Sequence, residues 1–429
     1  MGSIGPIGIL VVLILLAALL VPLIPVRRRQ GGLAGFPFVT LCLLVANLIL
    51  FAGNSQGGDL QESIALNWGL IPKQASLLTL FTYMFLHGSW AHVLGNMLGL
   101  WLFGPHVEEA LGKLEYLLFY LGAGIAGGLL HVVFADVFLP AAQTVPLVGA
   151  SGAIFGVLGL FAVRFWRTRM RVLLVFNVPA VWAVGVFALM QFAAGMISLA
   201  DGGANTTTAN WAHVGGFVFG MLIAVPLRMR EDSHREYSLE DALKAQAAGQ
   251  FDRAATYYRQ ILQLNPTDGD AHRALAQVCV HLRQGEAAHR HFMEALRLYV
   301  KAGNARAVSG VYGDALTSFE VFPLSPRLLQ QVASACEEAQ AYPLALSALS
   351  ELSREYPHTP EAEMGLLRLG RLHLGKLDQP QNAAGIFGEF LRMYPDSAWK
   401  HHAERLLRES THSLALTPAP TPGPAPQQG

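Results

Sequence analysis

The stretch Val148-Gly149-Ala150-Ser151-Gly152-Ala153-Ile154-Phe155-Gly156 places one serine between glycines inside an apolar run. A hydroxyl there serves no packing purpose, so Ser151 is a candidate nucleophile on a backbone that glycine leaves open to close approach. The same composition is also typical of helices that pack closely in membranes. Polar residues at matching depth in other apolar segments favour the first interpretation.

Composition indicates a membrane protein with a soluble part. The 429 residues are 52% hydrophobic and 14% charged, and the mean hydropathy is +0.37. These values are too apolar for an ordinary soluble enzyme. The cysteines Cys42, Cys279 and Cys336 lie far apart without metal-ligand spacing, which predicts neither a disulfide framework nor a zinc site.

Seven apolar stretches are candidate membrane spans. They are Ile4–Val26, Phe36–Phe51, Leu80–Gly104, Leu114–Phe134, Pro146–Val163, Val172–Ala200 and Ala209–Leu227. The basic cluster Arg27–Arg29 follows the first stretch instead of preceding it. This order predicts an uncleaved anchor with its N-terminus outside, because a signal peptide carries its positive charge in front.

Basic residues also predict the orientation of the other spans. Arg27–Arg29, Arg164–Arg171 and Arg228–Arg230 fall on one side under a seven-span count, and short cytoplasmic loops retain such residues. A predicted loop at Pro105–Lys113 carries mixed charge and therefore does not indicate the orientation. With the basic clusters inside, Ser151 and His213 lie near the beginnings of their spans, and so does His92 if its span proper starts only near Gly88. The three residues would then share one level near the outer surface.

The spacing around these residues suits serine chemistry. His213, Gly216 and Gly220 lie on one helical stripe, where the glycines would let a neighbouring helix approach. Phe155 follows Ser151 by four residues and could pack on the imidazole. His92 and Asn96, also four apart, can donate hydrogen bonds to an oxyanion. A histidine next to a serine suffices to activate it.

These motifs together resemble the rhomboid family of intramembrane serine proteases over about Phe36 to Leu227. They are Val148-Gly-Ala-Ser151-Gly, Ala212-His213-Val-Gly-Gly216 with Gly220, and His87, His92 and Asn96 in the pattern His-x4-His-x3-Asn. The family has a core of six spans, so Ile4–Val26 would be an extra helix in front. Some members have tyrosine where Phe155 stands, which removes a hydroxyl and keeps the ring.

The resemblance implies a role for each residue. Ser151 would be the nucleophile and His213 the general base. An oxyanion hole would form from His92, Asn96 and the backbone near Gly149 and Gly152, and His87 would support the adjoining loop. Substrates would be single-span membrane proteins with a destabilised helix, and Val172–Ala200, with Pro179, resembles the family's lateral gate. No cofactor, metal or nucleic-acid partner is expected.

Two other functions fit parts of the sequence. His92, Asn96 and the pair Glu108-Glu109 faintly resemble a metal-dependent membrane protease, although no HExxH motif is present. A catalytically inactive rhomboid-like scaffold could bind transmembrane helices and recruit partners through its C-terminal part. The intact Ser151/His213 combination counts against the scaffold.

After Arg230 the sequence becomes charged and repetitive. Ala254, Tyr258 and Leu262 recur at an offset of 34 residues as Ala288, Phe292 and Leu296, and Ala383, Phe387 and Leu391 repeat the spacing. This pattern is similar to the tetratricopeptide repeat. Such helix pairs stack into a solenoid that usually binds a peptide or protein.

The predicted architecture is all-α, a polytopic membrane bundle followed by a soluble α-solenoid. Its parts are an anchor and basic linker at 1–35, a protease domain at 36–230, a cytoplasmic repeat domain at 231–412 and a disordered Pro/Ala-rich tail at 413–429. The predicted location is a bacterial inner membrane, with the active site near the outer face. The predicted function is hydrolysis of peptide bonds in or near transmembrane helices, with the repeats recruiting substrates or partners.

Overall fold

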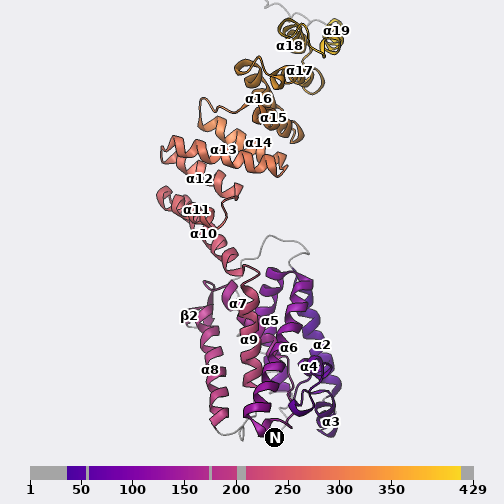
Figure 1. Ribbon diagram of the computed structural model, residues 1–429, viewed down its shortest axis with the longest axis vertical. Coiled ribbons are helices and arrows are strands. Elements are labelled where there is room, and N and C mark those ends of the chain that lie inside the picture. The colour runs from indigo at the N-terminus through magenta and orange to yellow at the C-terminus, as the bar shows by residue number, and fades with distance from the viewer. Residues whose placement is uncertain (1–35, 55–57, 173–175, 201–208, 417–429) are drawn as a thin grey trace, which may run out of the picture. The chain divides into compact units, whose positions relative to one another are not determined.

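A computed structural model describes residues 36–54, 58–172, 176–200 and 209–416 (Figure 1). The chain divides into two compact units, Met1–Ser233 and His234–Gly429, here called the first and second units. The predicted anchor Ile4–Val26 lies outside the described residues. The predicted domain boundary at 230/231 falls inside one helix, α10 (Met229–Ala247), and the units divide three residues later.

The first unit is a bundle of helices. In chain order they are α2 (Phe38–Asn54), α3 (Gly58–Trp68), α4 (Thr79–Thr82), α5 (Trp90–Leu111), α6 (Lys113–Phe138), α7 (Ser151–Arg164), α8 (Ala180–Ala200) and α9 (Asn210–Ala224). Short 3-10 turns occupy Pro72–Gln74, Tyr83–Phe85 and Pro140–Ala142. One antiparallel hairpin, β1 (Arg169–Val172) with β2 (Phe176–Pro179), pairs Arg169 with Pro179. The all-α class predicted from the sequence is confirmed apart from this hairpin.

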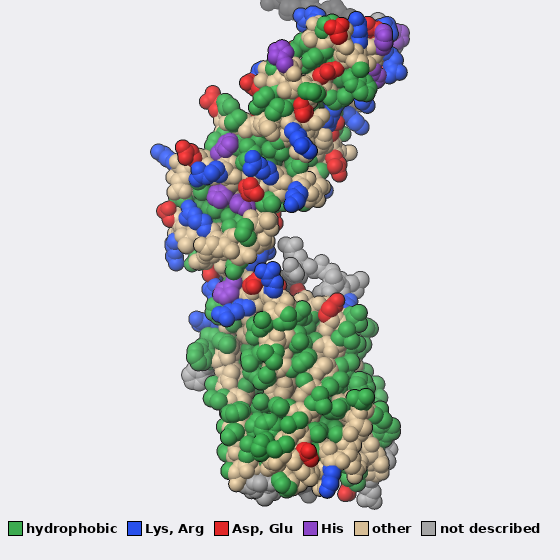
Figure 2. Space-filling view, viewed as in Figure 1, with side chains coloured by type: hydrophobic (Ala, Val, Ile, Leu, Met, Phe, Trp, Pro, Cys, Tyr) green, Lys and Arg blue, Asp and Glu red, His purple; other side chains and the backbone are tan. Residues whose placement is uncertain are grey.

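Helix α7 is the centre of the first unit. Every residue of α7 from Gly152 to Ala162 is buried, and α5, α6, α8 and α9 all pack against it. Figure 1 shows α5, α7 and α9 running alongside one another. On the outside of this unit, hydrophobic side chains are spread over the visible face in Figure 2, and the charged side chains in view lie near its two ends. An apolar exterior around a glycine-rich interior suits a lipid surrounding.

The described helices supply fewer long spans than the sequence predicted. By length and composition, α6 and α8 can each cross a membrane, and α9 with α10 forms a third candidate if that pair, bent by 66°, counts as one. Helices α2 and α7 are apolar but shorter. The described residues therefore do not contain the seven spans that the sequence predicted.

Three predicted span boundaries are wrong for local reasons. The stretch Leu80–Gly104 is broken, because the Ser89 side chain caps α5 by accepting from the His92 N–H at 3.2 Å. In Pro146–Val163 the helix begins only at Ser151, after extended residues. In Val172–Ala200 it begins at Ala180, because a hairpin strand that ends at Pro179 comes first. Apolar residues continue through the second and third breaks, so hydropathy alone does not reveal those two, whereas His87-Gly88-Ser89 interrupts the first.

The prediction of a loop at Pro105–Lys113 is also wrong. Helix α5 continues through Pro105 to Leu111 and ends at Gly112, whose φ of +96° favours glycine. The buried Glu108 explains this extension. Its carboxylate accepts from the backbone N–H groups of Val39 and Thr40 at 2.9 and 2.8 Å, and from the Thr40 hydroxyl at 2.7 Å. Glu108 thereby satisfies the first turn of α2, where unpaired donors favour an anion.

The second unit continues from α10 as a stack of helices. They are α11 (Phe251–Leu264), α12 (Gly269–His281), α13 (Gly285–Lys301), α14 (Ala305–Ser318), α15 (Pro326–Glu338), α16 (Tyr342–Glu355), α17 (Pro360–Gly375), α18 (Pro380–Met393) and α19 (Lys400–Leu416). Helix α19 reaches Leu416, so the first residues of the predicted tail 413–429 are helical. Residues 417–429 lie outside the described part.

Small and aromatic residues of the repeat form the core of this stack. The repeated alanines Ala254, Ala288 and Ala383 and the aromatics Tyr258, Phe292 and Phe387 are all fully buried or nearly so. Alanine in one helix leaves room for the aromatic ring of another. The 34-residue spacing thus marks the inward face of successive helices, as in a solenoid.

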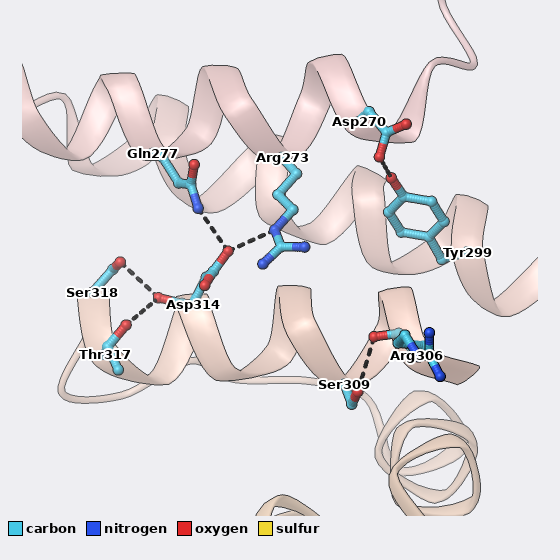
Figure 3. A network of polar contacts seen from close by, with 9 residues as sticks. All are labelled: Asp270, Arg273, Gln277, Tyr299, Arg306, Ser309, Asp314, Thr317 and Ser318. Carbon is cyan, nitrogen blue, oxygen red and sulfur yellow. Dashed lines mark hydrogen bonds and ion pairs between the residues drawn. The ribbon is translucent and has the colours of Figure 1, made fainter. Parts of the chain in front are cut away.

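Charged side chains link helices of the second unit at its surface. Asp314 of α14 accepts from Arg273 Nε at 2.7 Å and Gln277 Nε2 at 2.8 Å, both on α12 (Figure 3). In the same view Tyr299 of α13 bonds Asp270 of α12. These contacts tie three consecutive helices together, so the polar surface of this unit carries part of its helix packing.

Candidate active site

Ser151 and His213 meet at the beginnings of two helices. Leu147 pairs with Leu70 as an isolated β-bridge, Gly149 has a φ of +128°, and Ala150 is already in the helical region, so the chain turns at these two residues into α7, which begins at Ser151. His213 lies in the first turn of α9. Ser151 Oγ is 2.7 Å from His213 Nε2. This contact is the geometry in which an imidazole can remove the hydroxyl proton.

Glycines allow α7 and α9 to come this close. A β-carbon at Gly216 would overlap the carbonyl oxygen of Gly152, and one at Gly220 would overlap that of Gly156. The two helix backbones therefore touch directly. Any larger residue at either position would push His213 away from Ser151.

Phe155 supports the imidazole from the side. Its ring stacks on His213 with centroids 4.4 Å apart and planes within 9°. The Phe155 ring also stacks on Phe187 of α8, with ring centroids 5.2 Å apart and an angle of 23° between the planes. The histidine is thus held by a stack that crosses three helices.

His92 and Asn96 face Gly149 from α5. A β-carbon at Gly149 would come within 2.8 Å of His92 Nε2 and 3.5 Å of Asn96 Nδ2. Only glycine leaves this space open beside the serine. His87 is buried, and its Nε2 lies 2.9 Å from Asn96 Nδ2. Gln61 of α3 bonds the His87 carbonyl at 3.0 Å, so α3 braces the turn before α5.

The first turn of α7 offers backbone donors at the same place. Helix α7 starts at Ser151, so the N–H groups of Ser151, Gly152 and Ala153 have no acceptor within the helix. Gly152 packs against Tyr83, whose hydroxyl donates to the Gly124 carbonyl at 2.6 Å. Donors at a helix start can stabilise an oxyanion that forms on a carbonyl attacked by Ser151.

A cavity of about 830 Å³ opens in front of these groups. Its polar lining includes His92, Asn96, Ser151, Gln191 and His213, and its walls are apolar residues of α5, α7 and α8. Helices α5 and α8 thus face each other across it. This volume is in the range of sites that enclose a ligand of drug size, with few polar groups in an apolar pocket.

Gln191 is a site residue that the sequence analysis missed. Its Oε1 lies 2.8 Å from His213 Nδ1, on the opposite side of the ring from Ser151. The signal was available, because Gln191 is the one amide in the apolar segment Ala180–Ala200. A polar side chain in such a segment is costly and indicates a functional site, as Ser151 does.

The geometry speaks against the metal-dependent alternative. Glu108 lies sixteen residues beyond His92 on α5, about 24 Å away at the rise of an α-helix. Its carboxylate is occupied by the start of α2. Within the described residues, no group of three or more His, Cys, Asp and Glu side chains is arranged to hold a metal ion.

Comparison with known families identifies the class of each unit. The rhomboid domain model matches residues 74–230, and tetratricopeptide repeat models match residues 245–308 and 365–397. The chain therefore carries a rhomboid domain followed by tetratricopeptide repeats, which confirms the resemblance inferred from the motifs.

Curated relatives point to the same class. Rhomboid protease GluP of Bacillus subtilis (strain 168) is 29% identical over 204 residues, 46% of this chain and 36% of GluP. Rhomboid protein 1, mitochondrial, of Saccharomyces cerevisiae (strain ATCC 204508 / S288c) is 30% identical over 167 residues, 39% of this chain and 46% of the relative. Rhomboid protease GlpG of Enterobacter sp. (strain 638) is 28% identical over 200 residues, 46% and 64% respectively.

Each alignment covers less than two thirds of the relative's own length. Together with the rhomboid domain model at residues 74–230, these relatives support an intramembrane protease fold. The first unit is accordingly a membrane-embedded domain.

Proposed function

We propose that the protein is an intramembrane serine endopeptidase. The observation that carries the proposal is the 2.7 Å contact between Ser151 Oγ and His213 Nε2, next to a cavity of about 830 Å³. The rhomboid relatives named as proteases support the reaction class. Cleavage would act on transmembrane segments of other membrane proteins.

In this mechanism His213 Nε2 takes the Ser151 proton as Oγ attacks the peptide carbonyl. The resulting oxyanion accepts hydrogen bonds from the first-turn N–H groups of α7 and from Asn96 and His92. The imidazolium then gives its proton to the leaving amine, and an acyl-enzyme forms. Water, deprotonated by the same imidazole, hydrolyses that ester and regenerates Ser151.

Access to the site follows from the membrane setting. A spanning helix hides its peptide bonds in internal hydrogen bonds, so a substrate segment must unwind before attack. We place its entry between α5 and α8, because residues of both helices line the cavity. Small or helix-breaking residues in the substrate would ease unwinding.

Substitution of the two reacting residues tests the proposal. Ser151→Ala and His213→Ala should each abolish cleavage of a transmembrane reporter by the full chain in detergent, while melting temperatures stay near that of the native chain. The double variant should be no worse than either single one, because the residues act as a unit. Asn96→Ala should keep residual turnover, about 10²–10³-fold reduced, since other donors remain. Undiminished cleavage by Ser151→Ala would rule out the serine mechanism, and absence of cleavage by the native chain would leave a helix-binding scaffold as the function.

We further propose that the repeats bind cytoplasmic segments of substrates or partners, with the catalytic residues near the outer face of a bacterial inner membrane. The basic clusters Arg27–Arg29, Arg164–Arg171 and Arg228–Arg230 support this orientation. In a cysteine-free background, an external maleimide should label a cysteine at Gly2 in intact cells and should not label one at Ser238. Labelling of the cysteine at Ser238 would mean that the orientation is the opposite of the one proposed.

A chain that ends at Ser233, the last residue of the first unit, tests the contribution of the repeats. It should retain turnover of a generic unwound helix and lose efficiency on substrates whose tails the repeats bind, because recruitment raises local concentration without altering the chemical step. Equal loss on both substrates would instead mean that the second unit stabilises the first.

A further inference from the structure

Helix α8 reaches the Ser151–His213 pair with two side chains one helical turn apart. Gln191 Oε1 lies 2.8 Å from His213 Nδ1. Phe187 stacks on Phe155, which in turn stacks on the imidazole. The base is therefore in contact with α8 through a hydrogen bond and through a ring stack.

The hydrogen bond to Gln191 determines what the imidazole can do. A neutral imidazole carries one ring hydrogen, and the nitrogen without it is the acceptor. For Nε2 to accept the serine proton, that hydrogen must sit on Nδ1. Gln191 Oε1 is an acceptor at hydrogen-bond distance from Nδ1, so it favours the tautomer with a free Nε2. An amide does this without adding a negative charge.

The placement of Gln191 is costly unless it has a function. An amide in a lipid-facing helix loses its bonds to water and requires a partner. Ser198, another polar side chain of α8, bonds the Gly195 carbonyl within its own helix at 2.7 Å. Gln191 instead bonds the candidate base on α9.

Helix α8 is also loosely held compared with α6. In the most apolar window of each, 17% of α8 is buried against 39% of α6. Large apolar side chains such as Trp182, Leu189 and Met190 are exposed along it. A helix with little packing of its own nevertheless supplies the partner of His213.

We propose that Gln191 is a positioning residue that holds His213 in the tautomer and orientation able to accept the Ser151 proton. The competent state of the base then requires α8 to be packed against α7 and α9. The inference rests on the proposed protease function and adds a third member to the Ser151–His213 pair. It also makes α8 both a wall of the cavity and a support of the base.

Two variants of the full chain test this role in detergent. Gln191→Met keeps the length of the side chain and removes the acceptor. We expect kcat to fall about 10- to 100-fold, as for other groups that orient a reacting side chain, while KM stays within about twofold. Met190→Leu, on the exposed side of the same turn, is the matched control and should keep native kcat.

Gln191→Glu gives a second, opposite readout. A carboxylate next to Nδ1 stabilises the imidazolium, so the acid limb of the kcat/KM profile should move to higher pH. Other titratable groups that act on His213 are His92 of α5 and His131 of α6, and both remain unchanged in this variant. A merely structural role of Gln191 would not move the profile.

Nitrogen NMR on histidine-labelled protein reads the tautomer without activity. The difference spectrum between the native chain and His213→Asn should show an Nδ1-protonated ring, and Gln191→Met should shift signal toward the Nε2-protonated form. Native kcat in Gln191→Met together with an unmoved profile in Gln191→Glu would overturn the inference. If Gln191→Met does not fold, the profile of Gln191→Glu decides by itself.

A serine-reactive fluorophosphonate separates this inference from the proposed function. If the native chain is labelled no more than Ser151→Ala, the protease function fails. If the native chain is labelled at Ser151 and Gln191→Met is labelled as fast, the protease function stands and the role of Gln191 fails. Slower labelling of Gln191→Met supports both.

Discussion

The two units hold their helices together in different ways. In the first unit α7 and α9 touch backbone to backbone through Gly216 and Gly220, and single buried polar side chains such as Glu108 join helix ends. In the second unit large rings such as Phe292 fill the space between helices, and ion pairs lie at the surface.

The difference follows from the solvent. Water drives apolar side chains together, so burial of a large ring stabilises a soluble repeat. Lipid tails are as apolar as leucine and supply no such force between helices. Close van der Waals contact and hydrogen bonds must do this work in a membrane. Each unit should therefore be most sensitive to a different kind of substitution.

The largest effect is expected from Gly216→Val. Its side chain would collide with the Gly152 backbone, which cannot move without separating α7 from α9. The cost should exceed the ~1–3 kcal/mol typical of overpacked cores. Thermal unfolding in detergent should show loss of the transition of the first unit. Gly53→Ala on α2, where a β-carbon meets nothing within 4 Å, is the control and should leave it in place. A native transition in Gly216→Val would contradict the backbone-contact interpretation.

In the second unit, the most destabilising substitution should be Phe292→Ala. The ring is fully buried, and its removal should lower the free energy of unfolding of this unit by about 3–5 kcal/mol. Hydrogen exchange in the full chain should show faster opening of α12 and α13 and unchanged protection of α7. Val321→Ala, at a 72% exposed side chain, is the control and should change little. Equal loss of protection in α7 would show that the units are coupled and would break the comparison.

Glu108→Gln tests the buried polar contacts of the first unit. The amide keeps the shape of the side chain but loses the charge, and one of its ends would present a donor to the N–H groups of Val39 and Thr40. A loss of about 1–3 kcal/mol is expected for buried, charge-assisted hydrogen bonds. The melting temperature in detergent measures it. The exposed neighbour Glu109→Gln should be neutral, and equal effects of the two would discount the cap of α2.

The smallest effect is expected from Asp314→Asn in the network of Figure 3. The Asp314 and Arg273 side chains are 27% and 35% exposed, so water screens their ion pair. The free energy of unfolding of the second unit should fall by about 1 kcal/mol or less, and the difference should shrink in high salt. Glu286→Gln is the control, because the Glu286 carboxylate is almost fully exposed in its ion pair with Arg290. A loss as large as that of Phe292→Ala would mean that surface charge governs the repeats.

Much of the organisation could be predicted from the sequence because it is written in local periodicity. The 34-residue recurrence of alanine and aromatic residues predicted the repeats, and the serine and histidine motifs predicted the rhomboid domain. The exact limits of helices were harder. Apolar residues run on through Pro146–Ala150, so hydropathy does not mark the start of α7, which follows a bridge to Leu70. Helix α5 starts after the polar residues His87-Gly88-Ser89, at a serine cap.

By itself, then, the sequence determined the helical class, the two kinds of unit and the residue types from which a serine site can be built. Only the tertiary structure decided which polar side chains meet. Ser151 and His213 lie 62 residues apart in the chain, and their contact depends on glycines that let two backbones touch. Gln191 has its partner on the next helix of the chain, 22 residues away, and Glu108 has one 69 residues away on α2. Periodicity fixes the face of a helix on which a side chain lies, but the partner it finds there is fixed by packing, because a buried polar group must bond whichever neighbour the fold brings to it.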